Sequence, residues 1–284
     1  MIRFVGLMLV AAAAEALALD LRDDRGVTIS LARPAERIVA LAPHLAEMTF
    51  AAGAGAKLVG VSSFSRHPAD AERLPIVAAA GRIDIERLVA LRPDLVLGWK
   101  SGNSPLQLNQ LEHIGIPVFV TEVRSFADIP RIVRAVGALA GSVELAEARA
   151  RDFETEVERL RERYASRRPV AVFLEIWHRP MLTVSGSHLI SYALGLCGGR
   201  NVFAAAKALT PLVSREQILE ARPEAIVTAG FGGDTFSTWK GFELVPAVRD
   251  RRVFAIDPDE LHAQGPSVLA GVRALCEGLD RARS

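Results

Sequence analysis

Two glutamates occupy equivalent places in a repeated stretch of the sequence, and they could form charged contacts with a partner. The block Glu86–Gly98, ERLVALRPDLVLG, returns as Glu216–Thr228, EQILEARPEAIVT. Each acid falls in the expected first turn of a helix, where the helix dipole stabilises a carboxylate by a few tenths to about 1 kcal/mol. That effect explains one glutamate but gives no reason for two at the same place. Two carboxylates held apart on a rigid body would suit a two-fold symmetric partner that presents arginines.

A second group of residues follows the predicted strands and could bind a ligand. Loops at the carboxyl ends of parallel strands form ligand clefts. Aromatic side chains with few charges suit a large, flat, partly apolar ligand. Two of the three tryptophans could instead be core residues, although polar residues follow Trp99 directly and favour a loop there. The candidate ligand-binding residues are Phe64, Trp99, Trp177, Phe231, Asp259 and His262.

Sequence signatures of enzymes are incomplete, so we expect no catalytic residues, no cofactor and no metal site. Gly53-Ala-Gly55 lacks the third glycine of a dinucleotide motif and follows a predicted helix instead of a strand. Ser185-Gly-Ser187 is not a nucleophile elbow. The six histidines lie far apart, without metal-ligand spacing. His44 is the one to watch, because it directly follows a predicted strand and Pro43.

Each copy of the repeated block predicts the same unit of helix and strand. A polar residue, Asp84 or Ser214, stands at the N-cap position before an apolar-periodic stretch. The Arg-Pro pair ends the helix, because the residue before a proline is disfavoured in the α region. The apolar run that follows predicts a buried parallel strand. A unit built twice predicts two Rossmann-like α/β lobes with parallel sheets and a ligand cleft between them.

One long amphipathic helix is predicted to join the lobes. Apolar residues recur at helical spacing from Phe153 to Tyr164, among dense mixed charge. A helix of about 22 residues would span about 33 Å and act as a stiff spacer. The predicted organisation is a signal peptide at 1–18, a lead-in segment at 19–36, an N-terminal lobe at 37–141, the connecting helix at 142–168 and a C-terminal lobe at 169–284.

The first residues predict export. A basic start, Met1–Arg3, precedes the apolar run Phe4–Ala14 and the small-x-small pattern of Ala16–Ala18, as in a cleaved signal peptide. We therefore expect a periplasmic protein. In that oxidising compartment Cys197 and Cys276 predict a disulfide, with two buried thiols as the alternative. The 34 basic and 33 acidic residues form no basic stripe, so nucleic acid is not an expected partner.

Taken together, these segments resemble the periplasmic cobalamin-binding proteins of ABC importers, within the wider group that binds ferric siderophores and haem. The resemblance covers the mature chain and rests on Val61–Ser65, Ile85–Val96, Cys197–Phe203 and Val213–Leu219. It implies a ligand held between the lobes, and a monomer that docks on the membrane permease of an ABC importer through lobe-tip glutamates. Glu86 and Glu216 match those docking positions, and Cys197 and Cys276 match the family's disulfide.

The ligand-contacting positions match the family less closely. Phe64 and Trp99 stand where cobalamin binders have aromatic residues, whereas two other cleft tryptophans fall on Ala80 and Thr210. The loop Asp257–His262 lacks the arginine of the best-known member. Cobalamin, as transported ligand, is the leading candidate. The alternatives are a ferric siderophore or haem, for which Arg66, Arg82, His44 and His178 could serve, and an exported metal-dependent enzyme using His44 and His67.

Overall fold

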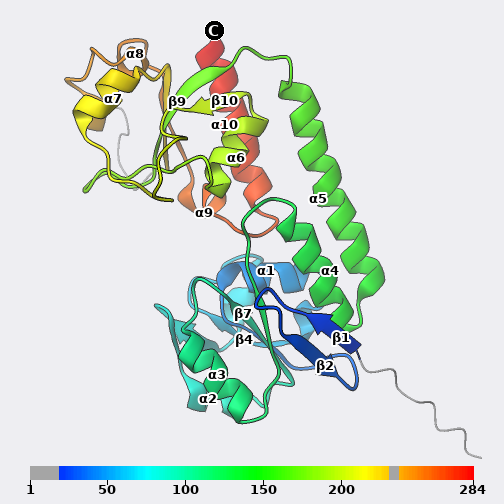
Figure 1. Cartoon of the computed structure of the whole chain (residues 1–284). Helices are drawn as coiled ribbons and strands as arrows, with labels where there is room; N and C mark the ends of the chain where they lie inside the picture. Colours follow the sequence, from blue (N-terminus) through cyan, green and yellow to red (C-terminus); the bar gives the residue numbers. More distant parts are fainter. Residues whose placement is uncertain (1–18, 230–236) are drawn as a thin grey trace, which may run out of the picture.

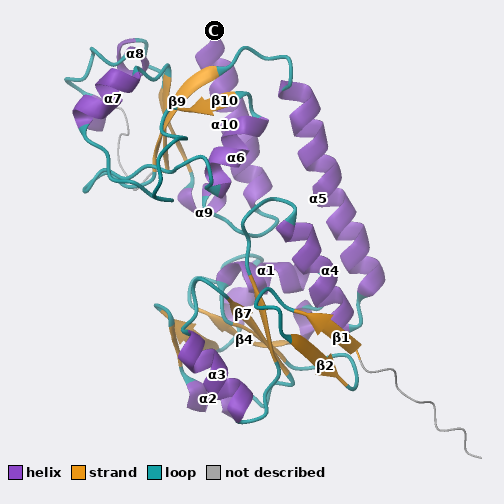
Figure 2. Ribbon diagram, viewed as in Figure 1, coloured by secondary structure: helices purple, strands orange, loops and turns teal. Residues whose placement is uncertain are grey.

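The structure is a computed structural model of the 284-residue chain, and it describes residues 19–229 and 237–284. The predicted signal peptide and Phe231 lie outside the described residues. Two α/β lobes stand one above the other, joined along one side by a long helix (Figures 1 and 2). The predicted fold class is thereby confirmed. Within the described residues no helix is long and apolar enough to cross a membrane.

The N-terminal lobe contains a six-stranded sheet in the order β6-β5-β4-β3-β7-β8. Its strands are β3 (Ile38–Ala40), β4 (Leu58–Ser62), β5 (Ile76–Ala79), β6 (Arg82–Ile83), β7 (Leu95–Trp99) and β8 (Val118–Thr121). Its helices are α1 (Pro43–Ala51), η1 (Gly55–Lys57), η2 (Ala69–Arg73), α2 (Ile85–Ala90), α3 (Pro105–His113) and α4 (Asp128–Ala140). The sheet is parallel except for the β5–β6 pair. The lead-in segment forms an antiparallel hairpin of β1 (Leu19–Arg22) and β2 (Thr28–Leu31).

The C-terminal lobe has a four-stranded parallel sheet in the order β10-β9-β11-β12. Its strands are β9 (Val170–Glu175), β10 (Gly199–Asn201), β11 (Ala225–Ala229) and β12 (Val253–Ile256). Its helices are α6 (Leu189–Leu196), α7 (Arg215–Ala221), η3 (Ser237–Trp239), α8 (Pro246–Arg249), α9 (Pro258–Leu261) and α10 (Val268–Arg283). The predicted disulfide is present and joins Cys197, at the end of α6, to Cys276 in α10.

The repeated block forms the same structure in both lobes. The Asp84 side chain accepts a hydrogen bond from the Arg87 N–H at the start of α2, and Ser214 caps α7 in the same way with Gln217. The arginine before each proline is left-handed, with φ of 47° at Arg92 and 45° at Arg222. Because this conformation cannot continue an α-helix, each helix stops there and the chain enters β7 or β11.

The connecting helix α5 (Val143–Tyr164) has the predicted 22 residues. Its apolar side, with Phe153, Val157 and Leu160 buried, belongs to a hydrophobic cluster that includes core residues of both lobes. The lobes are therefore linked through packed side chains as well as through the backbone. Close packing of this kind opposes a large hinge motion between the lobes.

Candidate functional site

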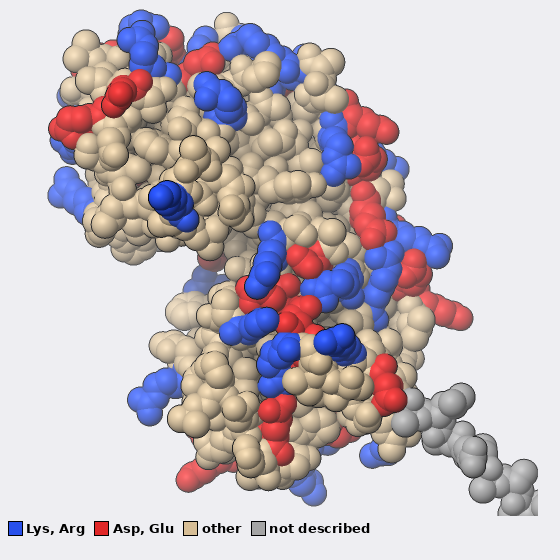
Figure 3. Space-filling model, in the orientation of Figure 1, with Lys and Arg blue, Asp and Glu red and all other residues tan. Residues whose placement is uncertain are grey.

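A cavity of about 430 Å³ lies at the junction of the two lobes. The N-terminal lobe contributes residues of α1, of the loop after β4 and of the end of β7, and the C-terminal lobe contributes α9 and the segment before α10. Figure 1 shows α1 and α9 at this junction, and the space-filling view shows the indentation between the lobes (Figure 3). Four of the predicted ligand-binding residues line the cavity: Phe64, Trp99, Asp259 and His262.

Phe64 is the most exposed aromatic residue of the cavity wall. The residue is 74% exposed, and the Arg66 guanidinium lies 5.6 Å from its ring centroid. Its backbone is left-handed, with φ of 64°. A bulky residue in this region is strained, and such outliers cluster at functional sites. The strained turn directs a large apolar ring to solvent beside the cavity, where a ligand could cover it.

Trp99 ends strand β7 and is held in place by the loop that follows it. The backbone N–H of Trp99 donates to Asn103 Oδ1 at 2.7 Å, and Asn103 Nδ2 donates to the Leu41 carbonyl. Gly102 allows the ring to fold back over the loop, since a Cβ at that position would lie 1.8 Å from a Trp99 ring carbon. The His44 ring packs edge-on against Trp99, with centroids 5.3 Å apart.

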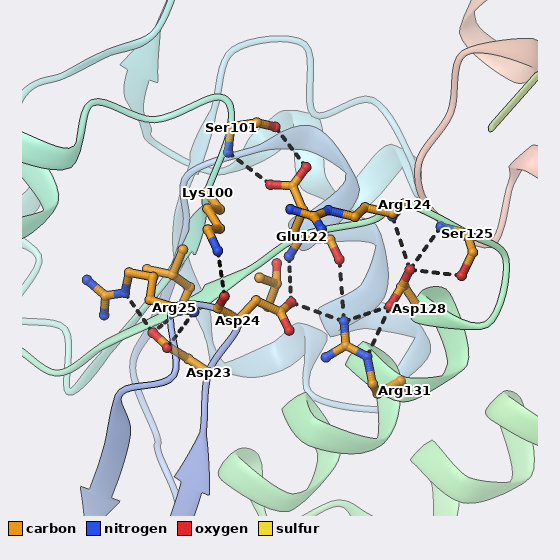
Figure 4. Close-up of polar contacts among 12 residues, drawn as sticks. Asp23, Asp24, Arg25, Lys100, Ser101, Glu122, Arg124, Ser125, Asp128 and Arg131 are labelled. Atoms are coloured by element: carbon orange, nitrogen blue, oxygen red, sulfur yellow. Dashed lines mark hydrogen bonds and ion pairs between the residues drawn. The ribbon is translucent and has the colours of Figure 1, made fainter. Parts of the chain in front are cut away.

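A polar network anchors the same loop to the rest of the lobe (Figure 4). Lys100 Nζ donates to the Asp24 carbonyl at 2.8 Å, and Ser101 donates through its N–H and Oγ to the Glu122 carboxylate. Arg131 in turn bonds to Asp24 and to the Glu122 carbonyl. These bonds tie the loop after β7 to the lead-in hairpin and to α4, so Trp99 stands on a rigid support.

Two polar contacts cross the cavity from lobe to lobe. Arg66 Nη1 donates to Asp259 Oδ2 at 3.1 Å, with both side chains more than half exposed. Glu47, on α1, accepts hydrogen bonds from the Ser267 backbone N–H and hydroxyl at the start of α10. Burial raises the pKa of Glu47, although both Ser267 bonds oppose that shift. Gly265 permits this close approach, because a Cβ there would lie 2.3 Å from Glu47 Oε2.

Three histidines of this region, His44, His188 and His262, have a lowered pKa, which favours the neutral ring. Burial lowers the pKa of His44 to about 4. Burial and the neighbouring His262 lower the pKa of His188 to about 4, and its ring accepts a hydrogen bond from the Ile190 N–H as the N-cap of α6. The pKa of His262 is also lowered, chiefly by burial. Among the described residues, no cluster of three or more His, Cys, Asp or Glu could hold a metal ion.

The other predicted site residues lie elsewhere. Trp177 follows β9 and is 44% exposed, but it does not line this cavity, and its ring N–H donates to the Arg179 carbonyl. His178 contacts Glu175, whose other oxygen accepts from the buried Trp239. Three polar contributors, Glu47, Gln264 and Ser267, were missed from the sequence. Glu47 could have been found, because it is three residues after His44 and so shares its helix face.

The two glutamates of the repeat are exposed and far from the cavity. Glu86 is in the first turn of α2 and Glu216 in the first turn of α7. Figure 1 shows α2 and α7 toward opposite ends of the molecule, both on the side away from α5. Hydrogen bonding to Ser214 lowers the pKa of Glu216, which favours its charged form. The chain thus presents one carboxylate at each lobe tip.

Comparison with known proteins places the chain in a family. The family described as "Periplasmic binding protein" matches residues 38–260. A vitamin B12-binding protein of Vibrio cholerae is 34% identical over 244 residues, 86% of this chain and 88% of that protein. One from Yersinia pestis is 36% identical over 249 residues, 87% of each chain. These relatives are binding proteins, and this rejects the alternative of an exported metal-dependent enzyme.

Solved structures agree with the sequence comparisons. The crystal structure of the periplasmic vitamin B12-binding protein of Vibrio cholerae has a TM-score of 0.80 at 34% identity, covering 88% of this chain and 99% of that one. A periplasmic haem-binding protein in complex with two haems has a TM-score of 0.78 at 24% identity, covering 87% and 99%. The second likeness shows a shared fold only. The chain belongs to the periplasmic binding protein family.

Proposed function

We propose that this protein captures cobalamin between its lobes in the periplasm and delivers it to the membrane permease of an ABC importer. The observation that carries the proposal is the aromatic cavity at the lobe junction, where Phe64 and Trp99 face residues of the C-terminal lobe. Its support from sequence is the 34–36% identity to vitamin B12-binding proteins over most of the chain. The protein acts as a monomer, exported by the signal peptide at 1–18.

The size of the cavity is consistent with partial enclosure of a large ligand. Pockets of about 300–1,000 Å³ enclose drug-sized ligands, and cobalamin is larger than these. A cavity of about 430 Å³ therefore encloses one face of the ligand, and the rest of the ligand covers exposed residues such as Phe64. Trp177, which follows β9 and is 44% exposed, is the proposed opposite wall.

A ferric siderophore or haem is the competing cargo. Such a ligand favours a cation or a metal-binding side chain that is available in the cavity. Arg66 is already paired with Asp259, and Arg82 and His178 do not line the cavity. His44 lines the cavity, but it is only 7% exposed. The pairing of Arg66 with Asp259 favours a ligand without strong negative charge.

Titration of the purified mature protein with cyanocobalamin, haem and a ferric siderophore, followed by calorimetry and absorbance, tests the proposal. Cobalamin should bind. Trp99→Ala removes a buried aromatic contact, commonly about 2 kcal/mol or more, and should weaken binding about thirtyfold. Leu106→Ala is the control, since Leu106 is exposed on α3 outside the cavity. Unchanged affinity in both Trp99→Ala and Trp177→Ala would show that the cleft has been misplaced.

A further inference from the structure

Three side chains of the cavity carry buried polar atoms without a hydrogen-bond partner. The atoms are His44 Nε2, Trp99 Nε1 and Gln264 Oε1. In the described part of the chain, only Thr183 Oγ1 and Thr228 Oγ1 share this property. Native proteins leave few buried polar groups unpaired, and each such group needs an explanation. Their concentration in one cavity indicates that a bound molecule completes the hydrogen bonding there.

The three groups come from both lobes. His44 is on α1 and Trp99 ends β7, with their rings in edge-to-face contact. Gln264 lies between α9 and α10, beside the residues that meet Glu47. His44 is only 7% exposed, so its ring is held by the core and cannot turn to solvent for a partner. A ligand that pairs with all three groups would contact both lobes.

The chemistry of these atoms is neutral and mixed. The indole N–H of Trp99 only donates, the side-chain oxygen of Gln264 only accepts, and a neutral imidazole does one or the other at each nitrogen. Burial keeps His44 uncharged, because it lowers the pKa to about 4. A primary carboxamide offers both an N–H donor and a carbonyl acceptor, so it matches this set. A carboxylate can only accept hydrogen bonds. It would therefore give the Gln264 side-chain oxygen, which is also an acceptor, no donor to pair with.

The charged groups near these atoms are already engaged. Arg66 pairs with Asp259, and the Glu47 carboxylate accepts two hydrogen bonds from Ser267. A carboxylate entering the cavity would lose its water, and it would gain a cation only by competing with Asp259 for Arg66. It would also approach the negative charge of Glu47.

We propose that His44, Trp99 and Gln264 form a hydrogen-bonding subsite that selects a peripheral carboxamide of the ligand over a carboxylate. The subsite rests on the proposed function, since it concerns which part of a corrinoid the cavity takes. It gives the cleft a specificity that aromatic burial alone does not provide, because an aromatic wall would accept amide-bearing and acid-bearing rings alike.

The test compares cyanocobalamin with its monocarboxylates, in each of which one peripheral carboxamide has been hydrolysed. The wild-type protein should bind at least one monocarboxylate tenfold or more weakly than cyanocobalamin. His44→Phe keeps a ring and removes Nε2, and Gln264→Leu removes Oε1. Each should weaken cyanocobalamin binding about threefold to tenfold, the usual effect of one lost hydrogen bond.

A charge substitution separates recognition from mere packing. Gln264→Lys places a cation in the subsite and should shift the preference toward the disfavoured monocarboxylate, by tenfold or more in the affinity ratio. Thr183→Val is the matched control, since it removes a buried unpartnered hydroxyl outside the cavity and should leave both affinities unchanged. Equal affinity of the wild type for all monocarboxylates and cyanocobalamin would overturn the subsite. Failure of the wild type to bind cyanocobalamin at all would refute the proposed function instead.

Discussion

Mild acid should destabilise this protein through His44. The imidazole is buried against Trp99 with an unpartnered nitrogen, and the fold accommodates it only when it is neutral. In the unfolded chain the same ring meets water and takes up a proton near its ordinary pKa of 6.5. Protonation therefore favours the unfolded chain over a defined range of pH.

The size of the effect follows from the two pKa values. The folded pKa is lowered to about 4, so the stabilisation from a neutral His44 is complete above about pH 6.5 and is lost as pH falls toward 4. Linkage between these values gives a loss of about 2 kcal/mol between pH 7 and pH 5, and about 3 kcal/mol once both states are protonated. Glu47 acts in the opposite sense, because a raised carboxyl pKa contributes stability at low pH and loses it as pH rises.

Urea unfolding at pH 7 and pH 5 measures the loss. Between pH 7 and pH 5 the free energy of unfolding should fall by about 2 kcal/mol less in His44→Phe than in the wild type, because the variant has no imidazole at position 44 to take up a proton. Glu47 and His188 are present in both proteins, so their contributions to the pH dependence cancel when the two losses are subtracted. His113→Phe is the matched control, because it makes the same substitution at an exposed histidine at the end of α3. Equal losses in the wild type and His44→Phe would refute the account of a neutral, buried imidazole.

Three further predictions concern docking, the disulfide and the lobes. The double variant Glu86→Ala with Glu216→Ala should keep the melting temperature and the cobalamin affinity but lose permease binding in a pull-down. The double variant Glu86→Lys with Glu216→Lys should bind the permease more weakly still. Normal permease binding by the Ala variant would mean that the two glutamates only stabilise their helices through the helix dipole. Replacing Cys197 and Cys276 with Ala opens a loop with a sequence separation of 79 and should lower the free energy of unfolding by about 4 kcal/mol in urea, whereas a change below about 1 kcal/mol would contradict the chain-entropy estimate. Small-angle scattering should show little change in the radius of gyration of the wild type on ligand binding. Glu47→Ala removes one contact between the lobes, so the ligand-induced change in radius of gyration should be larger in this variant. A large compaction of the wild type would contradict a rigid α5.

Local structure was predictable from the sequence because local rules determine it. The caps at Asp84 and Ser214, the stop at each Arg-Pro pair and the length of α5 follow from capping, proline sterics and apolar periodicity. The sheet hairpin of β5 and β6 was not predicted, and it departs from a purely parallel sheet. Its turn uses positive φ at Ala80 and Gly81, and the alanine gives no sequence signal for that conformation.

The site itself was only partly predictable, because its contacts join residues far apart in the chain. Glu47 and Ser267 are separated by 220 residues, and Arg66 and Asp259 by 193. No periodicity or motif relates such pairs. Phe64 and Trp99 were found because Phe64 lies just after β4 and Trp99 is the last residue of β7, so both lie at the carboxyl edge of the sheet. Gln264 was missed because it lies before a helix, in a segment without a pattern.

The two lobe-to-lobe contacts differ in burial, and this difference indicates which one a ligand can displace. The Arg66–Asp259 pair is more than half exposed on both sides, and exposed ion pairs contribute about 0–1 kcal/mol, so its rupture costs little. The Glu47 carboxylate is largely withdrawn from water and depends on Ser267 for its hydrogen bonds, so breaking that contact would leave a buried charge unpaired. Ligand entry should therefore open the contact at the rim and preserve the one at the base. The lobes then stay at the separation set by α5 and Glu47, and the two exposed glutamates at the lobe tips keep a spacing that a rigid partner can recognise.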